Sequence, residues 1–184
     1  MIVINLCILT VVIALYLLMI QSINTTPHHN HFSNTMELMK IKGGEMMKVQ
    51  ITKTIEAHAD NIWKTIRAYD NVESYIPMVT NSTISGTDEG SERVCKIQFG
   101  EQQAELVEKL DSVDEENKTI KISITNAPPP FSGQQNTFHV KPLDEKKAEL
   151  TISTEVADDN QQAAKGIEQV FQMAADGLKK LHEE

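Results

Sequence analysis

Arg93 and Glu108 are the two residues whose types and spacing best suit chemistry in a protein interior. If residues 100–101 form a two-residue turn, the flanking strands pair so that Arg93 faces Glu108 and Cys95 faces Leu106. Arg93 could then meet a carboxylate or keto group of a ligand, with Glu108 holding its side chain. The alternative interpretation is a cross-strand ion pair that contributes a fraction of a kcal/mol to stability. A one-residue slip in register would move both side chains to the other face of the sheet.

No other pattern indicates a catalytic centre. His139 alternates with Phe138 and is expected to face solvent, whereas His58 lies in a loop before a predicted helix. The sequence has no Ser-His-Asp order, metal-ligand spacing or phosphate-binding glycine motif. The His-rich tract at 28–31 has no carboxylate or cysteine beside it and is interpreted as incidental. We therefore assign no catalytic residue, no metal ligand and no cofactor.

The distribution of charge argues against a nucleic-acid partner. The chain of 184 residues has a formal net charge of −9. Residues 1–46 contribute nothing to it, because Lys40 and Lys42 cancel Glu37 and Glu45. The rest of the chain carries the whole acidic excess and has no basic stripe that could neutralise phosphates. The two cysteines lie in segments of different character, so no disulfide framework is expected.

Residues 1–46 are interpreted as an apolar N-terminal segment and linker, separate from a domain at 47–184. The run from Ile2 to Ile20 is long enough to cross a bilayer as a helix. It lacks the basic n-region and the cleavage site of a secretory signal. The nearby positive charges, Lys40 and Lys42, follow this run and would favour a cytoplasmic domain. One hypothesis is therefore a membrane anchor at 2–20 with the domain in the cytoplasm.

The second hypothesis for this segment is a mis-assigned translation start. Residues 42–45 can be encoded by a purine run that resembles a ribosome-binding site, and Met46 and Met47 follow it directly. The stretch at 21–35 shows no periodicity, as expected of a linker or of translated non-coding DNA. We expect a cytoplasmic protein that starts at Met46 or Met47, with a membrane as partner only if the N-terminal segment is genuine.

The domain shows the pattern of a strand, a helical break, a run of strands and one long helix. The elements expected first are a strand at Val49–Ile55, a helix within Ala57–Tyr69 and a short helix at Asn71–Tyr75. From Val79 apolar and polar residues alternate between turn signals, which is typical of an antiparallel meander with one wet face. After Val156 an apolar stripe at helical spacing continues to Leu181.

The closing helix is expected to leave a cavity. A helix of about 20 residues is roughly 30 Å long and can cross a sheet diagonally, but it cannot fill the concavity of a curved sheet. Ala174 and Gly177 are small and near its inward stripe, so they would leave space. The stiff Pro-rich loop at 126–133 is either a gate over the cavity or a plain connection. The expected ligand-binding residues are Arg93, Cys95, Phe99, Leu106, Glu108, Ile122, Phe131, Phe138, Phe171, Ala174 and Leu178.

Several motifs carry a family resemblance. They are Ile55-Glu56-Ala57-His58-Ala59-Asp60-Asn61-Ile62-Trp63, Tyr75-Ile76-Pro77-Met78-Val79, Gly86 with Gly90-Ser91-Glu92-Arg93-Val94-Cys95, and Gly100 with Glu105 and Asp111. In this order, over 47–184, they resemble the SRPBCC superfamily: polyketide cyclase/dehydrase and lipid-transport proteins, START-like proteins and pathogenesis-related allergens. The resemblance implies an α+β helix-grip fold, with a curved seven-stranded antiparallel sheet, two short helices and a long C-terminal helix over a hydrophobic cavity. Quinone-binding relatives share the Pro-containing stretch, which puts a prenyl-type ligand within range.

Three functions follow as hypotheses. The first is non-catalytic binding or carriage of a small hydrophobic ligand, such as a lipid, a quinone or a polycyclic molecule, in an internal cavity. The second is a cyclase or dehydratase acting on a cavity-bound aromatic or polyketide substrate through Arg93 and Glu108. The third is a protein-interaction module whose cavity is closed by side chains. The fold alone does not choose among them.

Overall fold

The protein is represented by a computed structural model that describes residues 33–41, 44–128, 131–157 and 161–183. Side chains before Met46, and those of Phe99 and Ala157, lie outside that description. The apolar run at 2–20 and the His-rich tract at 28–31 also lie outside it. Among the helices that are described, none has the length and apolarity needed to cross a bilayer.

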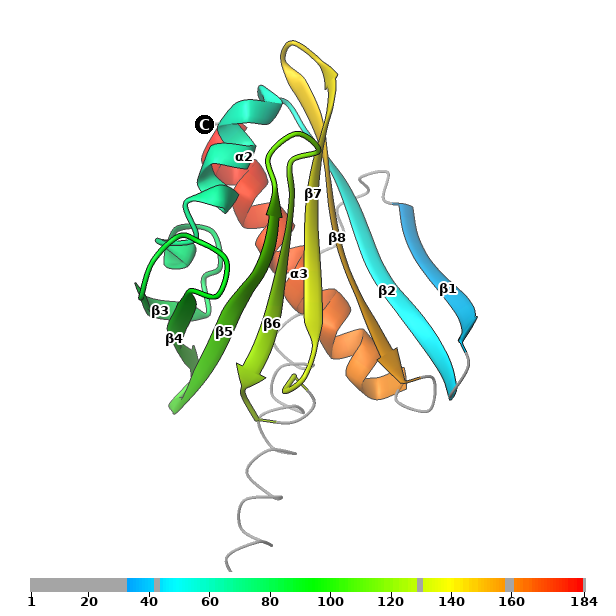
Figure 1. Ribbon diagram of the computed structural model, residues 1–184, viewed down its shortest axis with the longest axis vertical. Helices are drawn as coiled ribbons and strands as arrows, with labels where there is room; N and C mark the ends of the chain where they lie inside the picture. The colour runs from blue at the N-terminus through cyan, green and yellow to red at the C-terminus, as the bar shows by residue number, and fades with distance from the viewer. Residues whose placement is uncertain (1–32, 42–43, 129–130, 158–160, 184) are drawn as a thin grey trace, which may run out of the picture.

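One antiparallel sheet and one long helix dominate the fold (Figure 1). The strands are β1 Ser33–Ile41, β2 Gly44–Ile55, β3 Val79–Ile84, β4 Glu92–Phe99, β5 Gln102–Asp114, β6 Thr119–Asn126, β7 Gln135–Asp144 and β8 Lys147–Ala157. The helices are α2 Ala59–Arg67, the 3-10 turn η1 Val72–Ser74 and α3 Gln161–Glu183. The strand order is β1-β2-β8-β7-β6-β5-β4-β3, with every neighbouring pair antiparallel.

The predicted α+β helix-grip architecture is confirmed, with β2 to β8 as its seven strands. The structure adds β1, an eighth strand from the stretch that the sequence interpretation placed outside the domain. It pairs with β2 from Ser33 opposite Thr52 to Ile41 opposite Gly44. Backbone pairing needs no apolar periodicity, because it uses the N–H and C=O groups that every edge strand leaves unpaired. The translation start at Met46 or Met47 stays a prediction.

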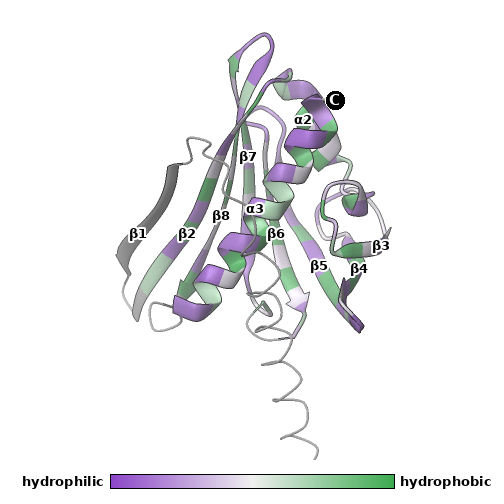
Figure 2. Ribbon diagram, turned by 180° about the vertical axis from the view of Figure 1, so that it is seen from behind, coloured by the Kyte–Doolittle hydropathy of each residue, from purple (hydrophilic) through white to green (hydrophobic). Residues whose placement is uncertain are grey.

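The strands bury one face and expose the other, as their alternation predicts (Figure 2). On β6, Ile120, Ile122 and Ile124 are buried, while Lys121 and Thr125 are exposed. The buried face is the concave one, across which α3 runs diagonally (Figures 1 and 2). The apolar core therefore lies between the sheet and this helix.

Helix α2 begins where the sequence supplies a cap and covers one end of the sheet. The ring nitrogen Nδ1 of His58, the N-cap residue, accepts a hydrogen bond from the backbone N–H of Asp60 at 3.2 Å. Trp63 is 6% exposed, and its indole N–H donates to Glu115 Oε2 at 2.8 Å, in the turn between β5 and β6. A buried indole with its one donor satisfied holds the helix against the sheet.

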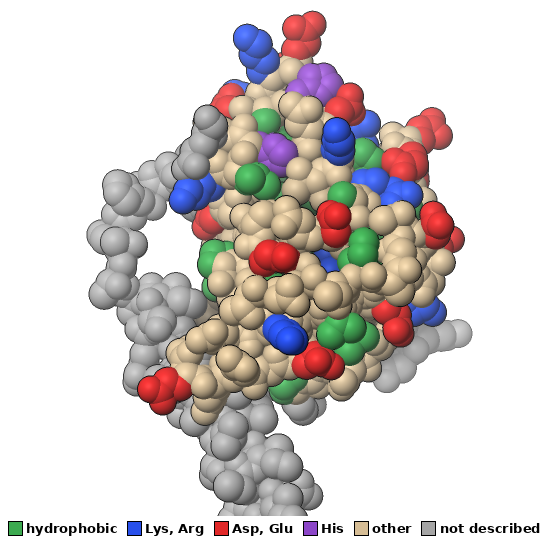
Figure 3. Space-filling model, turned by 90° about the vertical axis from the view of Figure 1, so that its left-hand side faces the viewer, with side chains coloured by type: hydrophobic (Ala, Val, Ile, Leu, Met, Phe, Trp, Pro, Cys, Tyr) green, Lys and Arg blue, Asp and Glu red, His purple; other side chains and the backbone are tan. Residues whose placement is uncertain are grey.

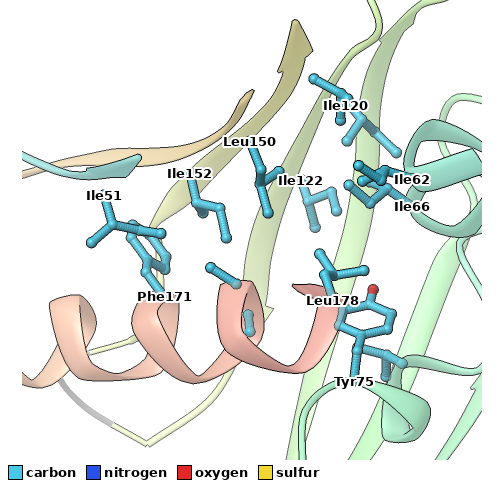
Figure 4. Packing of buried hydrophobic residues seen from close by; sticks show 14 of the residues in the cluster. Ile51, Ile62, Ile66, Tyr75, Ile120, Ile122, Leu150, Ile152, Phe171 and Leu178 are labelled. Carbon is cyan, nitrogen blue, oxygen red and sulfur yellow. The ribbon is translucent and has the colours of Figure 1, made fainter. Parts of the chain in front are cut away.

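Helix α3 makes its closest approaches to the sheet at β2 and β8. An ion pair between Lys53 of β2 and Asp176 of α3 ties these elements together. Burial lowers the pKa of Lys53 more than its charged neighbours change it. Figure 4 shows Phe171 beside Ile51 and Ile152, and Leu178 at the other end of the helix, facing Tyr75. This part of the interior is filled by aliphatic side chains that are almost fully buried.

Gly177 sets the position of α3 over η1. A Cβ atom at Gly177 would lie 1.8 Å from the carbonyl oxygen of Tyr75, so only a glycine permits this approach. The sequence interpretation that Gly177 leaves space for a cavity was therefore wrong. The backbone after η1 occupies that space, and the cavity lies elsewhere under the helix.

Candidate ligand-binding cavity

A cavity of about 140 Å³ lies under the half of the sheet that α3 does not contact closely. Its walls come from the inner faces of β4 to β7, from α3, from the η1 segment and from the loop after β6. The lining is mainly apolar, with polar groups contributed by Tyr75, Arg93, Glu108, Gln134 and Asn136. A concave, apolar site with a few convergent polar groups has the make-up of a small-molecule pocket.

Nine of the eleven predicted ligand-binding residues line this cavity. Those on strands are Arg93, Cys95, Leu106, Glu108, Ile122 and Phe138. The others are Phe131, in the loop after β6, and Phe171 and Ala174 of α3. Their contact with a ligand stays a prediction, but the structure does bring them to one site.

The other two predicted residues have different outcomes. Leu178 is fully buried but is not part of the cavity wall. It shares the inward stripe with Ala174, yet at its position α3 has already reached α2 and η1, and Ile66 and Tyr75 pack around it (Figure 4). The side chain of Phe99 lies outside the described part of the chain.

The predicted pairing of β4 with β5 is confirmed. Phe99 pairs with Gln102 across a two-residue turn, where Gly100 has a φ of 58°. Such a turn requires positive φ and is therefore favoured by glycine. The resulting register places Cys95 opposite Leu106 and Arg93 opposite Glu108.

Arg93 and Glu108 form an ion pair inside the wall of the cavity. Nε of Arg93 donates to Glu108 Oε2 at 2.7 Å, and Nη2 lies 2.6 Å from the same oxygen. The side chain of Arg93 is 4% exposed and that of Glu108 is 13% exposed. Burial is the largest influence on Arg93 and opposes its charge, but Glu108, together with smaller contributions from Tyr75, Cys95 and Tyr69, outweighs it, so the pKa of Arg93 lies above its ordinary value. The pair brings no net charge to the cavity.

Tyr69 completes the surroundings of the arginine. Nη1 of Arg93 donates to the carbonyl oxygen of Tyr69 at 3.2 Å, and the guanidinium carbon lies 4.5 Å from the centre of its ring. Tyr69 has a φ of 62°, an unusual value for a bulky residue. Burial raises the pKa of Tyr69 and that of Tyr75, so both phenols stay protonated. Arg93 is thus held at three of its nitrogens.

Cys95 lies beside this pair and is 2% exposed. Its thiol approaches Glu108 Oε2 at 3.7 Å. Burial, together with the negative charge of Glu108, raises the pKa of Cys95 to about 12, so the thiol stays protonated at neutral pH. Among the described residues, no group of three His, Cys, Asp or Glu side chains could hold a metal ion.

The cavity residues that were not predicted from the sequence include two buried polar ones. Gln134 and Asn136 are both 8% exposed and line the cavity where β7 begins. Counting back by twos from Phe138 would have placed both on the inner face, because alternate residues of a strand share a face. Their polarity concealed them, since the alternation was identified from apolar residues alone.

The Pro-rich loop contributes directly to the cavity wall. Ala127, Pro128 and Phe131 line it, and the N–H of Phe131 donates to the carbonyl oxygen of Pro128 at 3.2 Å. On the outer surface, the face that includes β3 and η1 shows acidic and basic side chains interspersed, with hydrophobic ones in small separate groups (Figure 3). On this face, therefore, the hydrophobic side chains form no single large patch.

Residues 46–183 match the model of a protein family described as polyketide cyclase / dehydrase and lipid transport. This match covers nearly the whole of the described domain. Among curated proteins, none has a sequence that matches this chain significantly.

Solved structures share the fold at low sequence identity. Zhui aromatase/cyclase from Streptomyces sp. R1128 is 14% identical, with a TM-score of 0.64 over 75% of this chain and 94% of its own. Ginseng major latex-like protein 151 from Panax ginseng is 14% identical, with a TM-score of 0.64 over 74% and 97%. Norcoclaurine synthase from Thalictrum flavum, in complex with dopamine and hydroxybenzaldehyde, is 21% identical, with a TM-score of 0.58 over 74% and 86%. At these identities the likeness shows the fold alone.

Proposed function

This chain belongs to the polyketide cyclase/dehydrase and lipid transport family, and we propose that it binds or carries a small hydrophobic ligand in the cavity beneath α3 without transforming it. The observation that carries this proposal is the make-up of the cavity. Its lining is mostly aliphatic and aromatic, and its charged groups, Arg93 and Glu108, are paired with each other. Binding to such a wall is favourable chiefly because apolar surface of the ligand is removed from water, at roughly 25 cal/mol per Å².

The state of the polar groups supports binding over catalysis. Cys95 is a protonated thiol, and the phenols of Tyr69 and Tyr75 are held protonated by burial. Arg93 donates to Glu108 and to a backbone carbonyl, so moving to a substrate would cost it those bonds. A group poised for proton transfer near neutral pH would instead have a pKa close to that pH.

The proposal is tested by filling the cavity in the full chain. Ala174→Phe places a ring where α3 lines the cavity and should abolish the binding of a fluorescent apolar probe, followed by titration. Gln162→Phe is the matched control, because Gln162 is exposed on the same helix. Native mass spectrometry of the wild type should show a co-purified hydrophobic adduct that Ala174→Phe lacks. Equal probe binding by wild type and Ala174→Phe would contradict a cavity site.

A second function is favoured by one observation: the charged pair and Tyr75 all reach the cavity. A cyclase or dehydratase would use Arg93 to polarise a ketone and Glu108 to move a proton. The fold accommodates such chemistry, since the norcoclaurine synthase structure holds dopamine and hydroxybenzaldehyde. Incubation with a short β-polyketone, followed by mass spectrometry for loss of water, tests it. Turnover that disappears in Arg93→Ala while binding persists would establish the enzyme and overturn the carrier.

A further inference from the structure

Asn136 lies in the cavity wall and carries an unpaired polar atom. Its side chain is 8% exposed and lines the cavity on β7. Its Oδ1 atom is buried, and no donor among the described residues lies within hydrogen-bonding distance of it. A buried acceptor without a partner costs about 1 to 3 kcal/mol, and such groups are rare in native proteins. This one therefore calls for an explanation.

The surroundings of Asn136 give no internal partner for that oxygen. Across β6 and β5 its neighbours in the same row are Ile122 and Leu110. The nearby hydroxyl of Thr154 on β8 donates instead to the carbonyl oxygen of Gln135, at 2.8 Å. Lys53 and Arg93, which are also buried, are partnered by Asp176 and Glu108. Two other buried oxygens among the described residues, Oη of Tyr69 and Oε1 of Gln102, also lack a partner, but neither residue lines the cavity. Of the three, Asn136 alone belongs to the cavity wall.

The cavity limits the size of the molecule that can supply the donor. At about 140 Å³ it is below the several hundred Å³ of pockets for drug-sized ligands. Cavities of roughly 150 Å³ lined by aliphatic and aromatic side chains hold one benzene ring. A single ring with small substituents therefore matches the space.

The charges limit the ligand further. Arg93 and Glu108 neutralise one another, so a charged ligand would bring an uncompensated charge into an apolar interior. A quinone has carbonyl acceptors but no donor, so it would leave Oδ1 of Asn136 unpaired. A hydroxyl group on the ring supplies the missing donor without adding charge.

We propose that the ligand is a neutral, single-ring aromatic compound whose hydroxyl group donates a hydrogen bond to Oδ1 of Asn136. This inference rests on the proposed function, because it names the class of ligand for the same cavity. It narrows the expected lipid, quinone or polycyclic ligand to a phenol-type molecule.

The test compares two probes of nearly equal shape, p-cresol and p-xylene, which differ by the hydroxyl group. Their dissociation constants are measured by calorimetry or ligand-observed NMR with the full chain and with Asn136→Leu. We expect the preference for p-cresol over p-xylene to fall about tenfold in Asn136→Leu, because the hydrogen bond is lost. Asn81→Leu, at an exposed position of β3, is the matched control and should keep the wild-type preference.

The unfolding temperature is a second readout. Replacing an unpaired buried amide by a similar apolar side chain should raise it, whereas an amide needed for structure would make it fall. Asn136→Val serves as a second apolar variant if Asn136→Leu does not fold. If both probes bind and Asn136→Leu keeps the wild-type preference for p-cresol, this inference is overturned and the proposed cavity function is left intact. The inference and the proposed function would both be overturned by a second pair of results. These are a wild type that binds neither p-cresol nor p-xylene, and equal binding of the apolar probe by wild type and Ala174→Phe.

Discussion

The two halves of the sheet meet α3 in different ways. Over β2 and β8 the helix lies close, and Ile51, Leu150 and Ile152 are at most 1% exposed in a filled core. Over β4 to β6 the sheet curves away, and Leu106, Glu108 and Ile124 line a cavity instead. Both halves carry the same alternation of apolar and polar residues along their strands. The difference between them comes from the path of one straight helix across a curved surface.

This contrast shows how a fold can make a binding site without a dedicated motif. A straight helix that packs closely against one half of a concave sheet must leave a gap over the other half. The side chains of the second half then face a space that they do not fill. We name the two regions the packed half, β2 and β8 under α3, and the open half, β4 to β6 around the cavity.

The largest expected effect tests how the open half is held together. Glu108→Gln leaves the guanidinium of Arg93 buried without a counter-charge and should cost about 3 to 5 kcal/mol of unfolding free energy. The double variant Arg93→Met with Glu108→Leu should recover most of that loss, because apolar pairs replace buried ion pairs at little cost. Urea denaturation gives both values. Lys147→Gln, which breaks the exposed pair with Glu56, is the control and should change little.

The next prediction compares the halves directly. Leu150→Ala in the packed half should cost about 3 kcal/mol, because it opens a void among fully buried neighbours. Ile124→Ala in the cavity wall should cost about 1 kcal/mol, since one side of Ile124 already faces space. Equal losses in urea denaturation would mean that both halves are packed alike.

A smaller effect is expected where the helix is positioned. Gly177→Ala forces a Cβ against the carbonyl of Tyr75 and should cost about 2 kcal/mol, because both contacting groups are backbone. In Gly86→Ala the new Cβ would meet Oγ of Ser91 at 2.8 Å, a side chain that can rotate away. That control should unfold nearly as the wild type does. If Gly177→Ala lowers the stability only slightly in thermal unfolding, α3 can shift over the open half.

The smallest effect concerns the wall of the open half. Because burial raises the pKa of Cys95 to about 12, only about a thousandth of its thiol is ionised at pH 9, so iodoacetamide should leave it almost unmodified at that pH. An exposed thiol with a pKa of about 8.5 is roughly three-quarters ionised at pH 9 and would be modified readily. Peptide-resolved mass spectrometry distinguishes Cys95 from Cys7. Ready modification of Cys95 at pH 9 in the folded protein would place its thiol in contact with solvent.

Local sequence rules predicted the features that depend on neighbouring residues. The Gly100 turn and strand alternation were sufficient to place Arg93 opposite Glu108. The helical stripe identified the inward face of α3 as far as Leu178, but Leu181, at its predicted end, is 45% exposed. Leu178 and Gly177 were misjudged because their surroundings depend on where η1 meets the helix, a contact distant in sequence. Asn136 was missed because the alternation was identified from apolar residues alone, although its spacing from Phe138 places it on the inner face. The strand β1 was missed because the sequence interpretation assigned residues 1–46 to a segment and linker outside the domain.

The place of α3 in the chain has a consequence for synthesis. The helix follows every strand of the sheet, so the whole apolar concave face leaves the ribosome before its cover exists. At translation rates of about 5 to 20 residues per second, the 23 residues of α3 take roughly one to five seconds to emerge. For that interval the nascent sheet exposes the surface that later forms both the core and the cavity. A ribosome-associated chaperone, or the ligand itself, would meet the open half at that stage.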